Sequence, residues 1–80
     1  MDRPGCLALR LMEAGHPVEE AIAFAGRFPS WRAAEPEALT AFGEATAALW
    51  REIAEGDGTP WKLGMAERAA TLARVLGGRL

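Results

Sequence analysis

The stretch PEALTAFGEATAALWREIAE, residues 36–55, carries the clearest periodic pattern in the chain. Its larger side chains recur at a 3-4-3-4 spacing with Trp50 beside them, and we name this row the seam: Leu39, Phe42, Thr46, Leu49 and Ile53. Side chains three and four residues apart share one face of an α-helix. The stretch therefore predicts one long amphipathic helix from Pro36 to Glu55.

Proline and glycine predict where the other helices begin and end. Glycine accepts the left-handed conformation that ends a helix, and proline is favoured in the first turn of the next one. Gly15 and Pro17 mark the first break, and Thr59 before Pro60 predicts a side-chain cap for the last helix. The expected helices cover residues 4–14, 17–26, 36–55 and 60–77, with a short helical or 3₁₀ connector near residues 30–35.

The composition favours an all-α fold. Alanine and leucine dominate the 80 residues, and tyrosine, asparagine and glutamine are absent. A chain of this length forms one domain over residues 1–80 and buries somewhat over ~60 % of its unfolded surface. We expect a compact bundle of four helices, in which the almost entirely apolar segment from Cys6 to Met12 makes the first helix central and buried.

The same composition indicates where the protein works. Cys6 is the one cysteine, so it cannot form an internal disulfide, and a reducing cytoplasm is expected. No uncharged run exceeds six residues, far short of the roughly 20 that span a bilayer. Eight arginines against one lysine favour a GC-rich coding sequence and hence a bacterial source.

The residues that catalysis needs are scarce. The chain has one histidine, one cysteine, one serine and two aspartates, whereas enzymes rely on groups that transfer protons or attack substrates. Glu13 and His16 have the Glu-x-x-His spacing found in metal-binding helical bundles, but Gly15 and Pro17 should break the helix within that motif. We expect no enzyme and no cofactor, and a metal-dependent enzyme assembled in an oligomer is the last alternative.

Each of the three tryptophans is followed at once by a base: Trp31-Arg32, Trp50-Arg51 and Trp61-Lys62. Tryptophan and arginine are the residues most enriched at binding hot spots. Trp50 lies within the long helix, so we expect it in the core or at a dimer interface. Trp31 and Trp61 lie at helix ends, where they either close the bundle or anchor a partner, with Arg32 and Lys62 as charges at the rim.

These features predict a small protein–protein interaction module, an accessory, adaptor or inhibitor-like subunit that acts through an apolar helix face. The heptad-like seam is wider than one small protomer should cover, so the partner is another protein or a second copy, with a homodimer expected. The candidate contact residues are Trp31, Arg32, Leu39, Phe42, Leu49, Trp50, Ile53, Trp61 and Lys62.

A nucleic-acid-binding transcriptional regulator is the second hypothesis. It would act as a dimer through the basic last helix, using Lys62, Arg68, Arg74 and Arg79. The net charge of −2 argues against general affinity for nucleic acids, which depends on neutralising phosphates. This hypothesis therefore ranks below the interaction module.

Overall fold

The computed structural model of the chain describes residues 2–78, with side chains described from Gly5 onward. This range holds no strand and five α-helices: α1 (Asp2–Glu13), α2 (Val18–Ala25), α3 (Pro29–Ala33), α4 (Pro36–Gly56) and α5 (Pro60–Gly77). The predicted all-α fold is confirmed. Each predicted helix is present with its ends shifted by at most two residues, and α3 is the expected helical connector.

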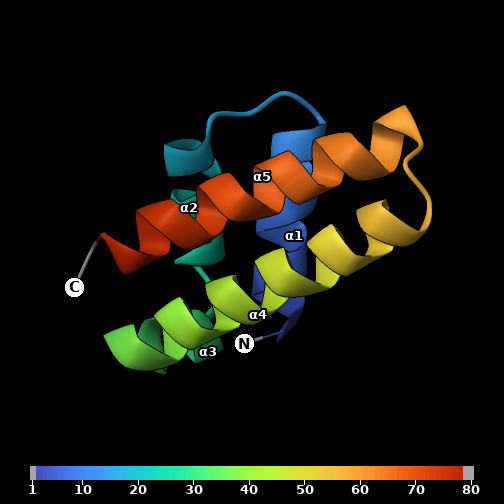
Figure 1. Cartoon of the computed structure of the whole chain (residues 1–80). Helices are drawn as coiled ribbons and strands as arrows, with labels where there is room; N and C mark the ends of the chain where they lie inside the picture. The colour runs from blue at the N-terminus through green and yellow to red at the C-terminus, as the bar shows by residue number, and fades with distance from the viewer. Residues whose placement is uncertain (1, 79–80) are drawn as a thin grey trace.

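The helices form a bundle in which one helix crosses an antiparallel pair. α4 and α5 lie side by side, and α1 crosses behind both of them (Figure 1). α2 packs against α1 and against the C-terminal half of α5, while α3 lies near the start of α4. Within residues 2–78, none of the helices combines the length and the apolar character that a membrane span requires.

Gly15 ends α1 in the way that the sequence predicts. Its φ of 105° lies in the left-handed region that favours glycine. The backbone N–H groups of Gly15 and His16 donate to the carbonyls of Met12 and Leu11, each at 3.0 Å. This pair of bonds is the Schellman motif, which satisfies carbonyls left free at the helix end.

Proline is the first residue of α3, α4 and α5. Thr59 occupies the N-cap position of α5, as the sequence predicts. The predicted side-chain cap is wrong, because the Thr59 side chain makes no capping hydrogen bond. Pro60 supplies the start instead. Its ring holds φ near the helical value, and it has no N–H group that would need a partner.

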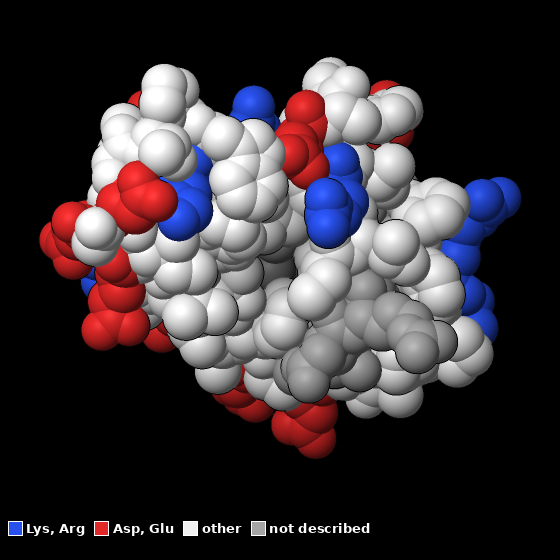
Figure 2. Space-filling view, turned by 90° about the vertical axis from the view of Figure 1, so that its right-hand side faces the viewer, with Lys and Arg blue, Asp and Glu red and all other residues white. Residues whose placement is uncertain are grey.

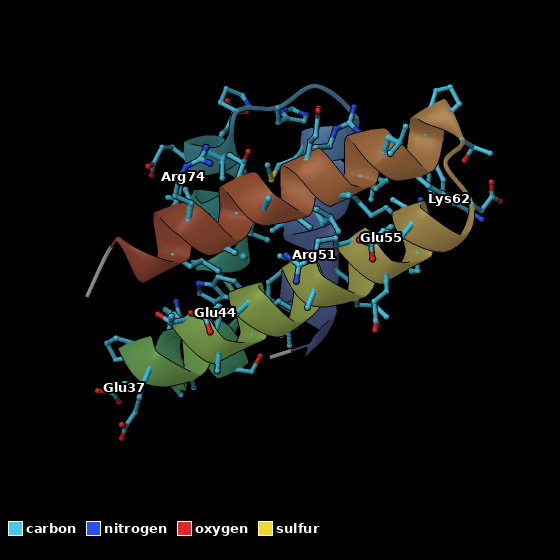
Figure 3. All side chains as sticks on the ribbon, in the orientation of Figure 1. Glu37, Glu44, Arg51, Glu55, Lys62 and Arg74 are labelled. Carbon is cyan, nitrogen blue, oxygen red and sulfur yellow. The ribbon has the colours of Figure 1, made fainter. Side chains whose placement is uncertain are left out.

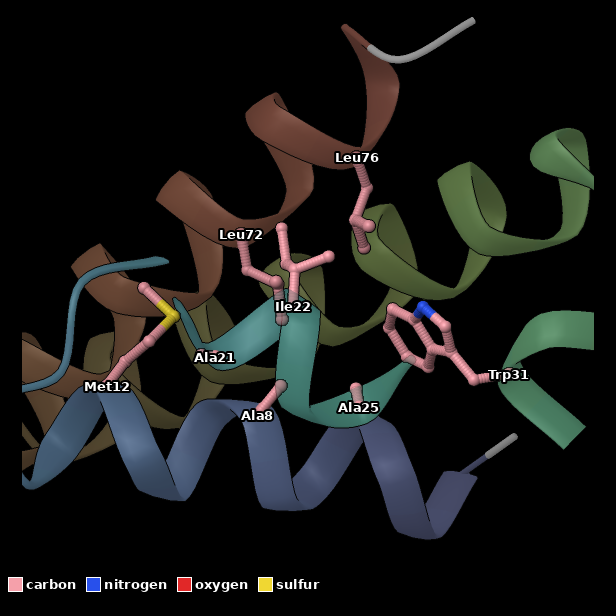
Figure 4. Packing of buried hydrophobic residues seen from close by; sticks show 8 residues of the cluster. All are labelled: Ala8, Met12, Ala21, Ile22, Ala25, Trp31, Leu72 and Leu76. Atoms are coloured by element: carbon pink, nitrogen blue, oxygen red, sulfur yellow. The ribbon is translucent and has the colours of Figure 1, made fainter. Parts of the chain in front are cut away.

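The main core lies where α1, α2, α3 and α5 meet (Figure 4). Its buried side chains are Ala8, Met12, Ala21, Ile22, Ala25, Trp31, Leu72 and Leu76. A second, smaller cluster consists of Leu9, Met65 and Ala69, with Ala47 and Trp50 packed against it. The main core is therefore built mostly from side chains of α1, α2 and α5, and α4 is held chiefly by its extensive contact with α5.

The prediction that α1 is buried on all sides is wrong. Ala8, Leu9 and Met12 are buried, but Cys6 is exposed and Leu11 is only partly covered. α1 makes its main contacts with α2 and α5. The described residues of this short chain form no further helix with which to cover the other side of α1, so that side stays exposed.

Small residues let α4 and α5 approach each other closely. A Cβ placed on Gly43 would lie 3.0 Å from the Cα of Ala73 and 3.3 Å from a methyl group of Leu76. Gly43 and Ala54 are the buried residues of α4. The antiparallel pair thus approaches closely through glycine and alanine, while Trp50 of α4 packs on the cluster that contains Met65 and Ala69 of α5.

Candidate interaction surface

The seam of α4 lies at the edge of the helix face that α5 covers. At 100° per residue, the buried Gly43 is about 100° round the helix axis from Phe42. The half-buried seam residues are Leu39, Phe42, Thr46 and Ile53. Leu49 is 54 % exposed, which is unusual for a leucine in the row that best predicts burial. Within one copy of the protein, the seam is thus only partly buried.

Trp31 does not serve as an exposed anchor. Its side chain is 5 % exposed and belongs to the main core, so of its two predicted roles it takes the one that closes the bundle. The ring meets Phe42 edge to face, with centroids 6.4 Å apart. Pro29 begins α3 and turns Trp31 inward, while Arg32 in the last turn remains exposed.

Trp61 is the large aromatic side chain that the fold leaves half open. It is 49 % exposed, and its ring meets Trp50 edge to face with centroids 5.6 Å apart. Trp50 packs in turn against the smaller core cluster, which makes it a half-buried support for Trp61. Edge-to-face pairs of this kind add about 0.5–1.5 kcal/mol beyond the area that they bury. Trp61 is therefore exposed but held in place.

A polar contact fixes the direction of the Trp61 ring. Its indole N–H donates to the carboxylate of Glu13 at the end of α1, and Arg10 lies 3.5 Å from the same carboxylate. The three residues come from the two ends of the chain, so their contact exists only in the folded state. Ring packing and this hydrogen bond together present one apolar face of Trp61 to the surface.

An apolar groove of about 290 Å³ runs between α1 and α4 beside Trp50. It is lined by Gly5, Cys6, Leu9, Arg10, Phe42, Thr46, Leu49, Trp50 and Met65. Leu49 is the most exposed of the large apolar side chains that line it, and Trp61 extends the apolar area through its contact with Trp50. We name the groove together with Leu49 and Trp61 the α1–α4 surface.

Six of these lining residues are absent from the sequence-based candidates: Gly5, Cys6, Leu9, Arg10, Thr46 and Met65. Cys6 belongs to the helix that is predicted to be buried, yet it is exposed at the groove. The periodic pattern within α1 describes one helix face only. The meeting of α1 with α4 depends on the crossing of distant segments, which leaves no periodic signal.

Most charged side chains of α4 lie away from this surface. Glu37, Glu44, Arg51 and Glu55 follow one side of the helix (Figure 3). Arg51, the base that follows Trp50, is exposed. Figure 2 faces the side of the molecule that bears the α4–α5 turn, and its centre is uncharged and hollowed with acidic and basic side chains around it.

Lys62 is engaged within the α4–α5 turn. Its ammonium group donates to the Asp57 carboxylate at 2.7 Å. This hydrogen bond, and next the positive charge of Lys62, hold the pKa of Asp57 below its ordinary value. The pair stabilises the start of α5, so Lys62 contributes less free charge to the rim of Trp61 than its sequence position suggests.

The bases of the nucleic-acid hypothesis do not form one stripe. Arg68 and Arg74 lie about 120° apart round α5 at 100° per residue, and Lys62 is paired with Asp57. Arg79 lies outside the described residues. The described bases of α5 thus offer separate charges rather than a continuous track for a phosphate backbone.

Glu13 and His16 do not face a common site. The Schellman turn separates them, and Glu13 contacts Trp61 and Arg10, while His16 lies 2.9 Å from Glu20. In the described part of the chain, no group of three or more potential metal ligands comes together. Each side chain of the motif has its own structural partner.

A second hollow, of about 590 Å³, lies between α4 and α5 on the side of Arg51. Its walls are Ala47, Arg51, Ala54, Glu55, Leu63, Ala66, Glu67 and Ala70. Leu63, 49 % exposed, is the one large apolar side chain among them. This hollow is larger than the groove between α1 and α4, and its walls are mainly small alanine side chains. It is also less apolar, because three of its lining residues are charged.

The α1–α4 surface is the place where aromatic rings, an exposed leucine and an apolar groove coincide. Its function has to be inferred from this geometry. No protein-family model matches the chain, and comparisons with curated proteins and with solved structures find no match either.

Proposed function

We propose that this protein is a small interaction module that associates with a second copy of itself through the α1–α4 surface. One observation carries the proposal: the half-exposed Leu49 lines the apolar groove, and the half-exposed Trp61 packs against Trp50, another residue that lines it. Burying such side chains is favourable by about 25 cal/mol of free energy for each Å² of apolar surface removed from water. A second copy that seats on the groove would cover both residues.

Two features support a second copy as the occupant. Leu49 projects beside the groove, so each copy offers both a protruding apolar side chain and a hollow to receive one. The edges of the surface carry charges of both signs, Arg10 on α1 and Glu52 on α4, which suits a self-complementary contact. The role is binding without a catalytic step, and a reducing cytoplasm would keep Cys6 a free thiol.

The test is the concentration dependence of the molecular mass, measured by sedimentation velocity and light scattering. We expect a monomer–dimer equilibrium for the wild-type chain and a monomer for Leu49→Asp, because a buried carboxylate without a partner disfavours the contact. Circular dichroism should show that Leu49→Asp keeps its helices, since residue 49 is half exposed in one copy.

Leu63→Asp is the matched control. Leu63 is also about half exposed but lines the other hollow, between α4 and α5. We expect Leu63→Asp to associate like the wild type. A wild-type chain that remains monomeric at millimolar concentration contradicts the proposal, as does a dimer that is lost in Leu63→Asp and kept in Leu49→Asp.

A further inference from the structure

We infer that the two copies meet across a two-fold axis at the α1–α4 surface, so that Arg10 of each copy pairs with Glu52 of the other. This inference rests on the self-association proposed above. It adds a defined orientation and a reciprocal ion pair, each half of which comes from a different copy.

The two charges lie on opposite edges of the apolar surface. Arg10 lines the groove from α1, and its side chain is largely exposed. On α4, Glu52 lies about 60° from Leu49 on the side away from Trp50, at 100° per residue. The order across the surface is therefore Arg10, the groove, Leu49 and then Glu52, with no charge between the edges.

A two-fold rotation about an axis between the groove and Leu49 exchanges these edges and seats Leu49 of each copy in the groove of the other. The Arg10 edge of one copy then faces the Glu52 edge of the other, and the contact forms twice. Arg10 already has a carboxylate neighbour in Glu13 at 3.5 Å. A guanidinium group has five N–H donors, so it can also bind the second copy's Glu52.

The exposed face of α4 supplies the remaining contact area. A standard interface covers about 800 Å² per partner, roughly a sixth of the 4871 Å² that this chain exposes. Ala41 and Ala45 are exposed on the same side of α4 as Leu49. Their small side chains allow the second copy's α4 to lie close, antiparallel to the first. Because few large side chains are involved, the dimer is weak and concentration-dependent.

Charge reversal tests the orientation. We prepare Arg10→Glu, Glu52→Arg and the double variant, and measure the dimer dissociation constant by sedimentation velocity at low salt. Each single reversal should weaken the dimer roughly tenfold, because the axis creates two like-charge contacts. The double variant restores opposite charges across the axis and should return the constant to within about threefold of wild type.

Arg51→Glu and Glu55→Arg are the matched controls, since both residues lie on the charged stripe of α4 that faces away from the surface. They should leave the dissociation constant within about twofold of wild type. Singles that have no effect, or a double variant as weak as the singles, overturn the two-fold pairing. If such a dimer is still lost in Leu49→Asp, only the orientation fails and the proposed self-association stands.

Cys6 gives an independent readout of the same interface. Its thiol is exposed at the groove in one copy, so a thiol reagent should modify it readily at low protein concentration. As the dimer forms, the second copy covers the groove and the modification rate should fall severalfold. Leu49→Asp should abolish this protection. If the molecular mass doubles but Cys6 is not protected from the reagent, the two copies meet elsewhere. That result overturns this inference and the proposed surface together.

Discussion

The ring of Phe42 lies directly against the backbone of Gly5, at the point where α4 meets α1. A Cβ at residue 5 would overlap the ring atoms Cε1 and Cζ. The ring is also held edge to face by Trp31, so it has little freedom to move aside. The absence of a side chain at residue 5 is thus what allows the two helices to come together here.

Gly5→Ala should lower the free energy of unfolding by up to about 2 kcal/mol. Overpacking a contact of this kind costs about 1–3 kcal/mol, and the better helix propensity of alanine returns about 1 kcal/mol. Urea denaturation followed by circular dichroism measures the difference. The double variant with Phe42→Leu should recover part of the loss, because the smaller side chain leaves room for the methyl group.

Gly64→Ala is the control for helix propensity alone. A Cβ at residue 64 would meet the guanidinium group of Arg68 at 2.8 Å, the far end of a flexible side chain that can swing away. We expect this variant to gain about 0.5–1 kcal/mol. If Gly5→Ala gains as much as Gly64→Ala, the contact with Phe42 does not limit the approach of α1 and α4.

Gly43→Ala should destabilise the antiparallel pair by up to about 2 kcal/mol, because overpacking costs about 1–3 kcal/mol and the better helix propensity of alanine returns about 1 kcal/mol. The added methyl group would press on the Cα of Ala73 at 3.0 Å, and backbone cannot rotate away as a side chain can. Thermal and chemical unfolding measure the loss. Gly56→Ala, at the end of the same helix, has open space around the new Cβ and should change stability by less than about 0.5 kcal/mol. Equal effects of the two variants would argue against a close approach at Gly43.

Trp31 and Trp61 should respond differently to truncation. Trp31→Ala removes a buried core ring and should cost about 3–5 kcal/mol, enough to unfold much of a chain this small. Trp61→Ala removes a half-exposed ring and should cost about 1 kcal/mol or less. Acrylamide quenching of fluorescence provides a second measurement, in which Trp61→Phe should lose most of the accessible emission. Loss of that emission in Trp31→Phe instead would reverse the assigned burial.

The Asp57–Lys62 pair should make a small contribution to the free energy of unfolding, and this contribution should be lost at acid pH. The pKa of Asp57 is lower in the folded state, so its contribution is complete above the unfolded pKa and is lost as the pH falls through the folded pKa. NMR titration of the Asp57 carboxyl should give a midpoint below the ordinary value. Lys62→Met should raise that midpoint and Lys62→Arg should largely preserve it. An unchanged midpoint in Lys62→Met would show that Lys62 is not the cause.

The extent of every helix could be predicted from the chain, because the signals are local. Pro36 and Pro60 begin helices since their fixed φ suits a first turn. Gly15 ends one because it can adopt a positive φ. The 3-4-3-4 spacing of residues 39–53 can be recognised from that one helix alone. Each of these effects acts within a few residues of the chain.

The candidate site could be predicted only in part. Leu49, Trp50 and Trp61 are among the sequence-based candidates, whereas the exposed Cys6 and the groove beside it are not. The same Trp-base pattern describes Trp31 and Trp61, yet one ring is buried and the other is half exposed. Sequence neighbours cannot separate these two cases, because burial depends on residues that are distant in the chain.

The sequence by itself determined an all-α chain and the beginning and end of each helix. Only the tertiary structure decided which face of α4 is covered. Gly43 and Ala54 are buried there because small residues let α5 approach closely, so the seam lies beside the covered face, where Phe42 and Thr46 line the groove and Leu49 is exposed. Hydrophobicity favours burial without specifying a partner, and the closest steric fit between helices selects the face that is buried.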